Sequence, residues 1–396
     1  MKVNVNALSV AIASLCFASQ SHAVYNLYTK DGLSVDLNGE IGVMAYKKES
    51  TFTALNEGGV QLSKAIELAQ GTTEEQSDKR VRLGEEAGSS WIEVRGSQKM
   101  NDGWRATGTI GLGYVGRNAL TTQGGAYLST ANVSIDKKNL GAVTVGRQFL
   151  HTAYVPRTGT YTPLENYGGQ SIRLDYTGVP NLHTSAYYNL PSSSDVRTKN
   201  KDETKGYGAS ASYLYPINDK SSVRVAAGYT NSERNPINED DSVAVGTKSS
   251  AVSLEYRYDR LLLAADYGKR KEDIKGYYVD NADIDYLGAK IGYAVTPTFN
   301  VAVGYGTKDI KRNPIAARQN IDAASLNSWV KAYGRLDYFL ESVEEKRVYA
   351  QADYYLRNNL RLYGRVDNYE TQTRARDENY AKLDTTEYRA GISFLF

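Results

Sequence analysis

Charged residues with a fixed spacing are the groups of this chain that could do chemistry. Glu93 and Arg95 stand on either side of Val94, and Arg173 and Asp175 flank Leu174 in the same way. Alternate residues of an extended strand point to opposite faces, so each charged pair shares one face and the apolar residues occupy the other. A face of this kind attracts ions and orients dipolar solutes without making or breaking bonds. The same parity assigns further residues to the charged face: Arg105, Arg361, Tyr363, Arg365, Asp367 and Arg389.

Residues suited to covalent chemistry are few. The chain has three histidines, His22, His151 and His183, and hydrolases usually rely on a histidine as the base. His183 stands beside Thr184 without a Ser and Asp pattern around it, which favours a structural or exposed role. The sequence has no metal-ligand spacing, phosphate loop or dinucleotide fingerprint. We expect no enzyme, no metal and no cofactor.

The first residues predict export. Lys2 is followed by an apolar stretch, residues 7–18, and by Ser21-His22-Ala23, a small-x-small cleavage site. We expect a signal peptide over residues 1–23 and a mature domain over 24–396. Cys16 is the only cysteine, and Leu15 before it argues against a lipoprotein. The mature chain would then cross an oxidising compartment without disulfides.

The composition suits a membrane-spanning β-barrel. Tyr (32) far outnumbers Phe (7), Gly is plentiful (35), and the mean hydropathy is −0.50. After the signal there is no apolar run of ~18 residues, which excludes a helical membrane protein. Without Lys2 the chain has 46 basic against 45 acidic residues, since 47 − 1 = 46. This balance argues against nucleic acid as a partner, which favours a concentrated basic face.

Alternation with period two recurs along the chain and predicts strands. Long polar stretches, including 47–78, 191–205, 231–247, 270–282 and 371–384, alternate with short turns, the pattern of an up-and-down barrel. A helix is expected within 60–69. An extra strand-like stretch, 329–340, leaves eighteen strands as the alternative to sixteen. The sixteen predicted strands are 33–46, 79–99, 103–114, 126–136, 140–149, 171–177, 181–190, 206–216, 221–230, 248–258, 260–270, 283–295, 298–309, 346–356, 359–370 and 385–396.

Strand number decides what such a barrel can do. The interior of an eight-stranded barrel is filled by its own side chains, whereas a barrel of sixteen to eighteen strands contains an aqueous channel. We therefore expect an all-β, transmembrane antiparallel barrel that contains a pore.

Several segments resemble enterobacterial general porins, in the order in which those proteins carry them. Residues 25–39 resemble their first strand, 92–98 their second, and 145–148 the strand that leads into their third loop. Residues 171–176 resemble the strand that leaves this loop. The end of the chain, 388–396, resembles the signal read by the barrel-assembly machinery, with apolar residues on alternate positions: Tyr388, Ile392, Phe394 and Phe396.

The resemblance implies a Gram-negative outer-membrane location, contact with lipid and lipopolysaccharide, and a homotrimer of barrels with one pore each. It also implies a third loop, about 150–170, folded into the lumen as a constriction with acidic groups opposite a basic ladder. In this sequence Arg95, Arg105 and Arg173 would form the basic side, with Glu165 and Arg157 on the loop. The alternative is that these residues are ordinary solvated charges of the barrel wall, far from the narrowest point.

This sequence departs from that pattern in two places. Trp91-Ile92-Glu93 replaces an Arg-Leu-Gly triplet, although Arg80 and Arg82 could substitute in a shifted register. Glu165 is the only acid of the third loop. Both changes argue against a strong cation preference. Arg147 shares the parity of Val143 and Val145, so we expect it to anchor the loop root or to lie at a subunit contact.

Three other functions remain open: an outer-membrane hydrolase, a substrate-specific channel for solutes such as oligosaccharides, and an adhesin or receptor barrel. The first lacks a defensible histidine site. The second would need aromatic rings in a track along the lumen, with Trp91, Tyr114, Tyr154, Tyr161 and Tyr363 as candidates. We favour passive diffusion of ions and small hydrophilic solutes.

Overall fold

The structure of the chain is a computed structural model. The predicted signal peptide, the helix expected within 60–69 and the strand-like stretch 329–340 lie outside the residues that it describes. The described residues are 25–55, 78–85, 90–115, 125–192, 203–235, 244–275, 281–312, 342–357, 359–375 and 378–396.

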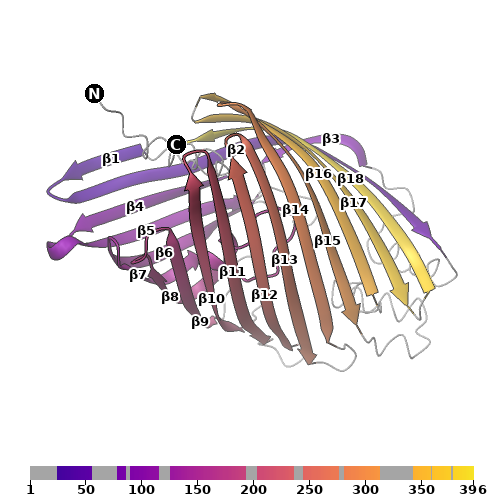
Figure 1. Cartoon of the computed structure of the whole chain (residues 1–396), viewed down its shortest axis with the longest axis horizontal. Coiled ribbons are helices and arrows are strands. Elements are labelled where there is room, and N and C mark those ends of the chain that lie inside the picture. Colours follow the sequence, from indigo (N-terminus) through magenta and orange to yellow (C-terminus); the bar gives the residue numbers. More distant parts are fainter. Residues whose placement is uncertain are drawn as a thin grey trace.

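Strands make up almost all of the described chain (Figure 1). No helix in these ranges is long and apolar enough to cross a membrane. The short 3₁₀ helices are η1 (Asn101–Gly103) and η2 (His151–Tyr154). The strands are β1 (Tyr25–Lys30), β2 (Leu33–Ala54), β3 (Asp78–Glu85), β4 (Trp91–Lys99), β5 (Trp104–Val115), β6 (Gly125–Lys137), β7 (Gly141–Phe149), β8 (Tyr167–Tyr176), β9 (Leu182–Ser192), β10 (Glu203–Asn218), β11 (Ser221–Asn235), β12 (Ala244–Tyr258), β13 (Leu261–Lys275), β14 (Ala282–Thr296), β15 (Phe299–Arg312), β16 (Ser342–Arg357), β17 (Leu360–Ala375) and β18 (Glu378–Leu395).

The strands close into an antiparallel barrel. Each strand from β4 to β18 pairs with the next, and β2 joins the two ends because it pairs with both β4 and β18. Strands β1 and β3 also pair with β2. Strand β1 lies on the same side of β2 as β18, and β3 lies on the same side as β4, so neither adds a position to the ring. Setting β1 and β3 aside leaves sixteen of the eighteen strands as the wall, which confirms the predicted count.

The closure is tight where the two ends of the wall meet. The Gly39 amide donates to the Phe396 carbonyl at 2.6 Å, and the Phe396 amide donates back at 2.9 Å. A Cβ on Gly39 would come within 2.4 Å of the Phe396 ring, so this close approach requires glycine. Tyr388, Ile392 and Phe394 of β18 are all exposed. Their role as an assembly signal stays a prediction.

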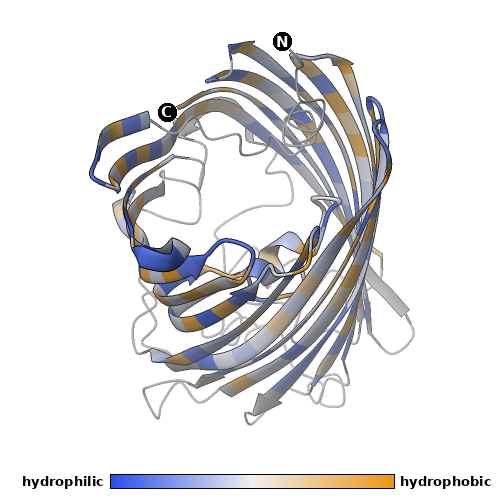
Figure 2. Ribbon diagram, turned by 60° about the vertical axis from the view of Figure 1, so that its left-hand side comes forward, coloured by the Kyte–Doolittle hydropathy of each residue, from blue (hydrophilic) through white to orange (hydrophobic). Residues whose placement is uncertain are grey.

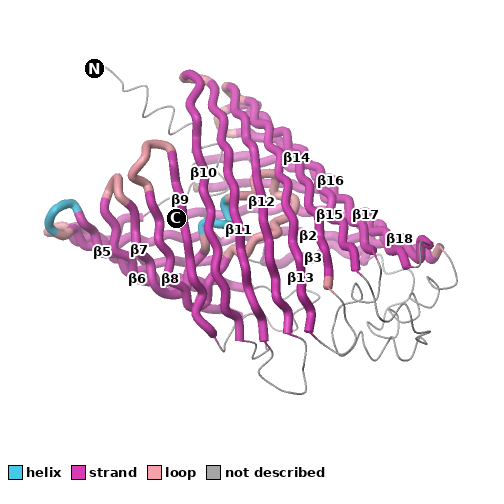
Figure 3. The backbone as a smooth tube through the Cα atoms, turned by 60° about the horizontal axis from the view of Figure 1, so that its bottom comes forward, coloured by secondary structure: helices cyan, strands magenta, loops and turns pink. Residues whose placement is uncertain are grey.

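Short turns connect the strands at one end of the barrel (Figure 3). Within the described residues, the non-glycine residues with left-handed φ are aspartates and asparagines in these turns, the residue types that adopt this conformation most readily. The predicted turns around Asp102, Asn139 and Asp259 are therefore confirmed. The full set is Asp31, Asp102, Asn139, Asn181 and Asp259.

Two predicted boundaries were wrong. Residues 79–99 were predicted as one strand, but β3 and β4 are separate, since the polar stretch 86–90 interrupts the alternation. The polar connections were predicted too long: β11 continues to Asn235 and β18 begins at Glu378. Backbone pairing needs no apolar face, so a ladder can continue into a segment that lacks the period-two signal.

Side chains alternate between two environments along the wall. In β12, Val252 and Leu254 are exposed, whereas Ser253 and Glu255 between them are buried. The bands of hydropathy along the strands in Figure 2 show the same alternation around the ring. In a membrane barrel the exposed apolar residues face lipid and the polar face lines the interior.

Candidate functional site

The connection between β7 and β8, residues 150–166, is described throughout and is called the L3 segment below. The carboxylate of Asp266 in β13 is its main anchor. It accepts the backbone N–H groups of Arg157 and Thr158 at 2.8 and 2.7 Å, and the Thr158 hydroxyl at 2.6 Å. Asp266 is 9% exposed. A buried carboxylate with several donors is well satisfied, so this contact fixes the middle of the segment.

Strand β16 holds the next part of the L3 segment through three side chains. The Tyr349 hydroxyl donates to the Thr158 carbonyl at 2.5 Å, and the Arg347 guanidinium donates to the Thr160 carbonyl at 2.9 Å. The Tyr161 hydroxyl donates to Glu345 at 2.6 Å. Burial and this carboxylate raise the pKa of Tyr161 well above its usual range.

Small residues of the wall form the surface on which the L3 segment rests. A Cβ on Gly288 in β14 would come within 2.3 Å of the Thr158 hydroxyl, and one on Gly306 in β15 within 2.7 Å of Thr160 Cβ. Nearby, side chains of the segment pack into an apolar cluster with the wall: Val155, Leu164, Ala226 and Ala251.

The residues that contact the L3 segment belong to the polar face. Asp266 precedes the exposed Tyr267, and Tyr349 follows the exposed Val348. Because neighbours along a strand point to opposite sides, the segment packs on the side opposite to the exposed apolar residues.

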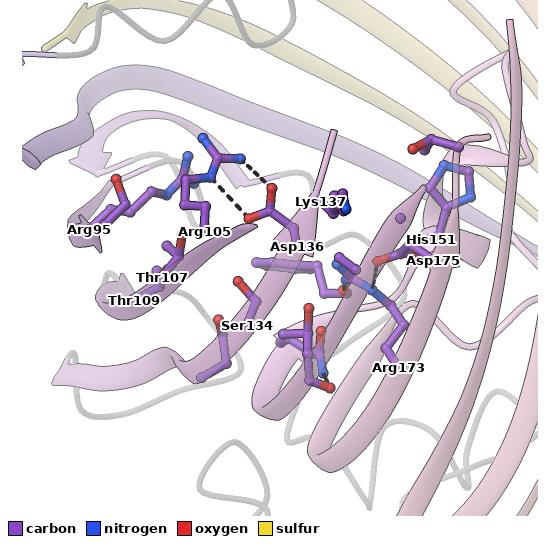
Figure 4. Close-up of a pocket in the computed structure, with 18 of the residues that line it drawn as sticks. Arg95, Arg105, Thr107, Thr109, Ser134, Asp136, Lys137, His151, Arg173 and Asp175 are labelled. Carbon is purple, nitrogen blue, oxygen red and sulfur yellow. Dashed lines mark hydrogen bonds and ion pairs between the residues drawn. The ribbon is translucent and has the colours of Figure 1, made fainter. Parts of the chain in front are cut away.

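A cavity of about 790 Å³ extends along the polar side of β2 and β4–β9 and reaches His151 and Tyr154 of the L3 segment. It brings together five residues that the sequence predicted as lumen charges: Glu93, Arg95, Arg105, Arg173 and Asp175. Figure 4 shows Arg95 and Arg105 near each other, and Arg173 beside Asp175 on the same strand, β8.

Each arginine of this cavity is bonded to a carboxylate. Arg95 donates to Glu93 at 2.9 Å, and Arg173 donates to Asp175 at 2.8 Å, both two residues away on the same strand. Arg105 makes two hydrogen bonds of 3.0 Å to Asp136 of β6. The three arginines of this part of the wall therefore form local ion pairs, and the basic ladder that the resemblance implies stays a prediction.

The other predicted residues lie elsewhere. Glu165 accepts the Ser232 hydroxyl of β11 at 3.0 Å, near the end of the L3 segment. Arg361 lies 3.8 Å from Glu40, and Arg365 donates to Asp367 at 2.7 Å. The predicted set is thus divided among the cavity, the L3 segment and the wall at β17.

Arg147 lies at the root of the L3 segment. Arg147 pairs with Ala131 of β6, but the pairing of β7 with β8 is irregular between Gly146 and Gln148, on either side of it. Its guanidinium donates to the Leu128 carbonyl at 3.2 Å and lies 3.4 Å from the Tyr167 hydroxyl. These bonds join β6 to the start of β8, as an anchoring role would require.

His151 and His183 lie together in the lining of the cavity. The rings of His151 and His183 are 3.8 Å apart between centroids, with His151 3.0 Å from the Ser210 hydroxyl and His183 3.3 Å from Asp175. Burial, then the neighbouring His183, lowers the pKa of His151 to about 4. In the described part of the chain, no group of three or more His, Cys, Asp or Glu residues could hold a metal ion.

The aromatic candidates are dispersed. Tyr114 shares the parity of the exposed Ile110 and Leu112, whereas Tyr363 is buried on the polar side. Tyr154 lines the cavity, and Tyr161 is bonded to Glu345. Trp91 is half-buried.

Several residues of the polar face escaped the sequence analysis. Asp266, Arg347 and Tyr349 acquire their role from a segment more than a hundred positions away. One sequence signal could have found other residues of the polar face. An acid and an arginine two positions apart recur along the strands, as in Glu255 and Arg257.

Comparison with known proteins identifies the family to which the chain belongs. A family profile described as Gram-negative porin matches residues 7–374. No curated protein sequence matches. The trimer form of OmpT from Vibrio cholerae is 14% identical over 92% of this chain and 100% of its own, with a TM-score of 0.60.

Two further solved structures share the fold. The outer membrane channel DcaP of Acinetobacter baumannii is 12% identical over 93% of this chain and 99% of its own, with a TM-score of 0.59. An anion-selective porin from Comamonas acidovorans is 14% identical over 92% of this chain and 100% of its own, with a TM-score of 0.57. With the family profile covering nearly all of a closed sixteen-stranded barrel, the chain belongs to the Gram-negative porin family and is an outer-membrane channel.

Proposed function

We propose that the chain is a passive, non-enzymatic channel for ions and small hydrophilic solutes, narrowed by the L3 segment inside the barrel. One observation carries this proposal: the segment is bonded to polar-face residues of β11, β13 and β16, while a charged cavity lies along the opposite strands. A segment held on one side leaves the other side for water and solutes.

The cavity charges and the L3 segment together would form the constriction. Arg95, Arg105 and Arg173 contribute cations and their partners contribute carboxylates, so the gap presents alternating signs. Such a surface interacts with dipolar solutes and disfavours apolar ones, since charges act more strongly there than in bulk water. Arg157 and Glu165 would contribute from the L3 segment, and Arg361 and Arg365 from β17.

Conductance across a planar lipid film tests the channel itself. We expect stepwise ohmic currents in potassium chloride, and liposomes that swell in sugars at a rate declining smoothly with sugar mass. Swelling confined to one sugar class, with saturable block, would instead mean a substrate-specific channel. A protein that inserts and carries no current would overturn the proposal.

Glu165 offers a sharper test of the constriction. Glu165→Gln removes a negative charge from the L3 segment, and the reversal potential in a salt gradient should shift toward anions with little loss of conductance. Asp283→Asn is the control, because Asp283 is exposed and pairs with Lys271 at 3.5 Å on the outer side. A reversal potential that does not move removes Glu165 from the constriction.

The assembly follows the same family pattern. We propose export by a signal peptide over residues 1–23, delivery by the barrel-assembly machinery through the β18 end, contact with lipopolysaccharide, and a homotrimer. The trimer form of the Vibrio cholerae OmpT supports the last point. Cross-linking of the detergent-extracted protein should give a three-chain species, and a single-chain species alone would contradict it.

A further inference from the structure

Hydroxyl side chains form a continuous row across the wall of the cavity. In the strand register, Ser97 of β4 lies opposite Thr107 of β5, and Thr107 lies opposite Ser134 of β6. Ser134 in turn lies opposite Thr144 of β7. All four residues line the cavity, and we call them the hydroxyl row. Figure 4 shows Thr107 and Ser134 on this wall. Neighbouring strands are ~4.8 Å apart, so the row presents one hydroxyl group at each strand spacing.

Arg173 ends the hydroxyl row on β8. It lies opposite Thr144 in the register of β7 with β8, and it also lines the cavity. Its guanidinium donates to Asp175 through Nε at 2.8 Å and to the Phe149 carbonyl through Nη1 at 2.6 Å. Because a guanidinium is planar and rigid, two such bonds fix its orientation. The row of hydroxyl groups therefore leads to a cation that the protein holds in place.

In each ion pair of the cavity, the arginine is more exposed than its carboxylate. The side chain of Arg173 is 23% exposed, against 9% for Asp175. The side chain of Arg105 is 54% exposed, against 22% for Asp136. The third pair differs in the same direction. A solute in the cavity therefore meets guanidinium N–H groups more readily than it meets the carboxylates.

Charge in the cavity is nearly balanced, so recognition of a solute depends on geometry. Among the described residues that line the cavity, five are lysine or arginine and four are aspartate or glutamate. A solute gains most where its own groups match the hydrogen-bonding groups of the wall. Hydroxyl groups both donate and accept hydrogen bonds, as the hydroxyls of a sugar do. Guanidinium N–H groups match the oxygens of a carboxylate.

The size of the cavity suits a small solute. Its volume of about 790 Å³ lies within the range of small-molecule pockets, ~300–1,000 Å³. The row crosses four strand spacings from β4 to β8, a length of ~19 Å. The wall that holds the L3 segment has a different pattern, since one cross-strand row from β11 to β14 consists of Arg224, Glu255, Ala264 and Lys290. A row of hydroxyl groups is therefore not a consequence of barrel geometry alone.

We propose that the hydroxyl row and Arg173 form a binding subsite for sugar acids inside the channel. The hydroxyl groups of the solute lie along Thr107, Ser134 and Thr144, and its carboxylate binds the Arg173 guanidinium. The inference rests on the proposed channel function and names a solute class that this function favours. The channel still passes other small hydrophilic solutes, since hydrogen bonds to one wall slow a bound solute without excluding the others.

Block of the ionic current by three probes of similar size tests the subsite. Glucuronate carries hydroxyl groups and a carboxylate, glucose carries hydroxyl groups alone, and cyclohexanecarboxylate carries a carboxylate on a ring without hydroxyl groups. The current is measured across a planar lipid film at constant ionic strength. Block by glucuronate should saturate, with a half-blocking concentration about fivefold or more below that of either other probe, as expected for the added hydrogen bonds.

Two kinds of variant separate the parts of the subsite. Ser134→Ala and Thr107→Val each remove one hydroxyl group and should raise the half-blocking concentrations of glucuronate and glucose by about fivefold. Arg173→Gln should raise that of glucuronate by about tenfold and leave that of glucose unchanged, because only the carboxylate needs the cation. Thr247→Val is the matched control, since Thr247 is a buried threonine of β12 that does not line the cavity.

The outcomes separate the two proposals. Absence of current through the unmodified protein would overturn the channel function. A conducting channel would overturn the subsite alone if glucuronate and cyclohexanecarboxylate blocked it equally, or if Ser134→Ala and Thr107→Val behaved like Thr247→Val. Because the two hydroxyl variants lie on different strands, a folding failure of one leaves the other as the test.

Discussion

The wall at β11–β16 and the wall at β4–β8 have the same strand architecture but carry different side chains on the polar face. At β14 and β15, Gly288 and Gly306 let the L3 segment approach the backbone closely. At β4, β5 and β8, Arg95, Arg105 and Arg173 project into a cavity of about 790 Å³. The alternation that builds both walls is the same, so the difference lies only in the size and charge of the polar-face side chains.

This comparison shows how one barrel obtains an off-centre passage. Gly288 and Gly306 leave space that the L3 segment occupies, and longer side chains of the same wall, such as Asp266 and Tyr349, bond to it. On the other wall the charged side chains line the cavity. Changes that remove this asymmetry should have graded effects.

The largest effect is expected from Asp266→Ala. It leaves the buried amides of Arg157 and Thr158 without their acceptor, at a cost of ~1–3 kcal/mol for each donor. The L3 segment should detach, lowering the unfolding temperature and raising single-channel conductance. Asp136→Ala, on the opposite wall, is the comparison, and equal losses in the two variants would contradict the anchoring role.

Overpacking the surface below the L3 segment should have the next largest effect. In Gly288→Val the new side chain meets Thr158 and Thr160, and forced overpacking costs ~1–3 kcal/mol. Conductance and the sugar size limit should both rise. Gly364→Val is the matched control, since a Cβ there meets nothing within 4 Å. A conductance equal to that of the control would mean that the segment is held elsewhere.

Acidification should loosen the root of the L3 segment. The folded-state pKa of His151, about 4, lies below its ordinary value of 6.5, so the unfolded chain binds the proton first as pH falls. This contribution to stability is present above pH 6.5 and is lost as pH falls toward 4. The groups that face the ring are Tyr154, Asp175, Arg173, Arg157, His183 and Ser210.

Unfolding temperatures measured from pH 7 to pH 4 check this expectation. His151→Gln keeps a polar group near Ser210 and removes the titration, so its profile should be flatter than that of the unmodified protein. Parallel profiles would exclude His151 as the titrating group.

The smallest effect is expected from the exposed pair of the cavity. Arg105 is more than half exposed, and surface ion pairs contribute ~0–1 kcal/mol. Asp136→Asn should leave the unfolding temperature within about that range. It should nevertheless shift the reversal potential toward anions, which separates a conduction role from a stability role. A large loss of stability would show that the two walls do not differ as described.

Most of the fold was predictable from the sequence because alternation and turn chemistry are local. The sixteen strand positions follow from runs such as Val252 to Tyr258, and the turns from residues such as Asp102 and Asn139. The division of β3 from β4 was missed because the polar stretch 86–90 was included in one predicted strand. Strand ends were misplaced because a ladder can continue into a polar segment that lacks the period-two signal.

The site was predictable only in part. Parity placed Arg95, Arg105 and Arg173 on one face, and the cavity brings them together. It could not reveal that Asp136 neutralises Arg105, or that Asp266 and Tyr349 hold the L3 segment. Those partners come from distant strands, and a single sequence carries no record of which distant residues meet.

The seam between β2 and β18 has a consequence for how the molecule forms. The hydrogen bond between Tyr46 and Glu387 joins residues 341 positions apart, and contacts so distant in sequence form slowly. Until β18 arrives, the sheet has two open edges, which lipid cannot satisfy and which attract other chains. A chain that is released without β18 would therefore keep these open edges and be prone to aggregation.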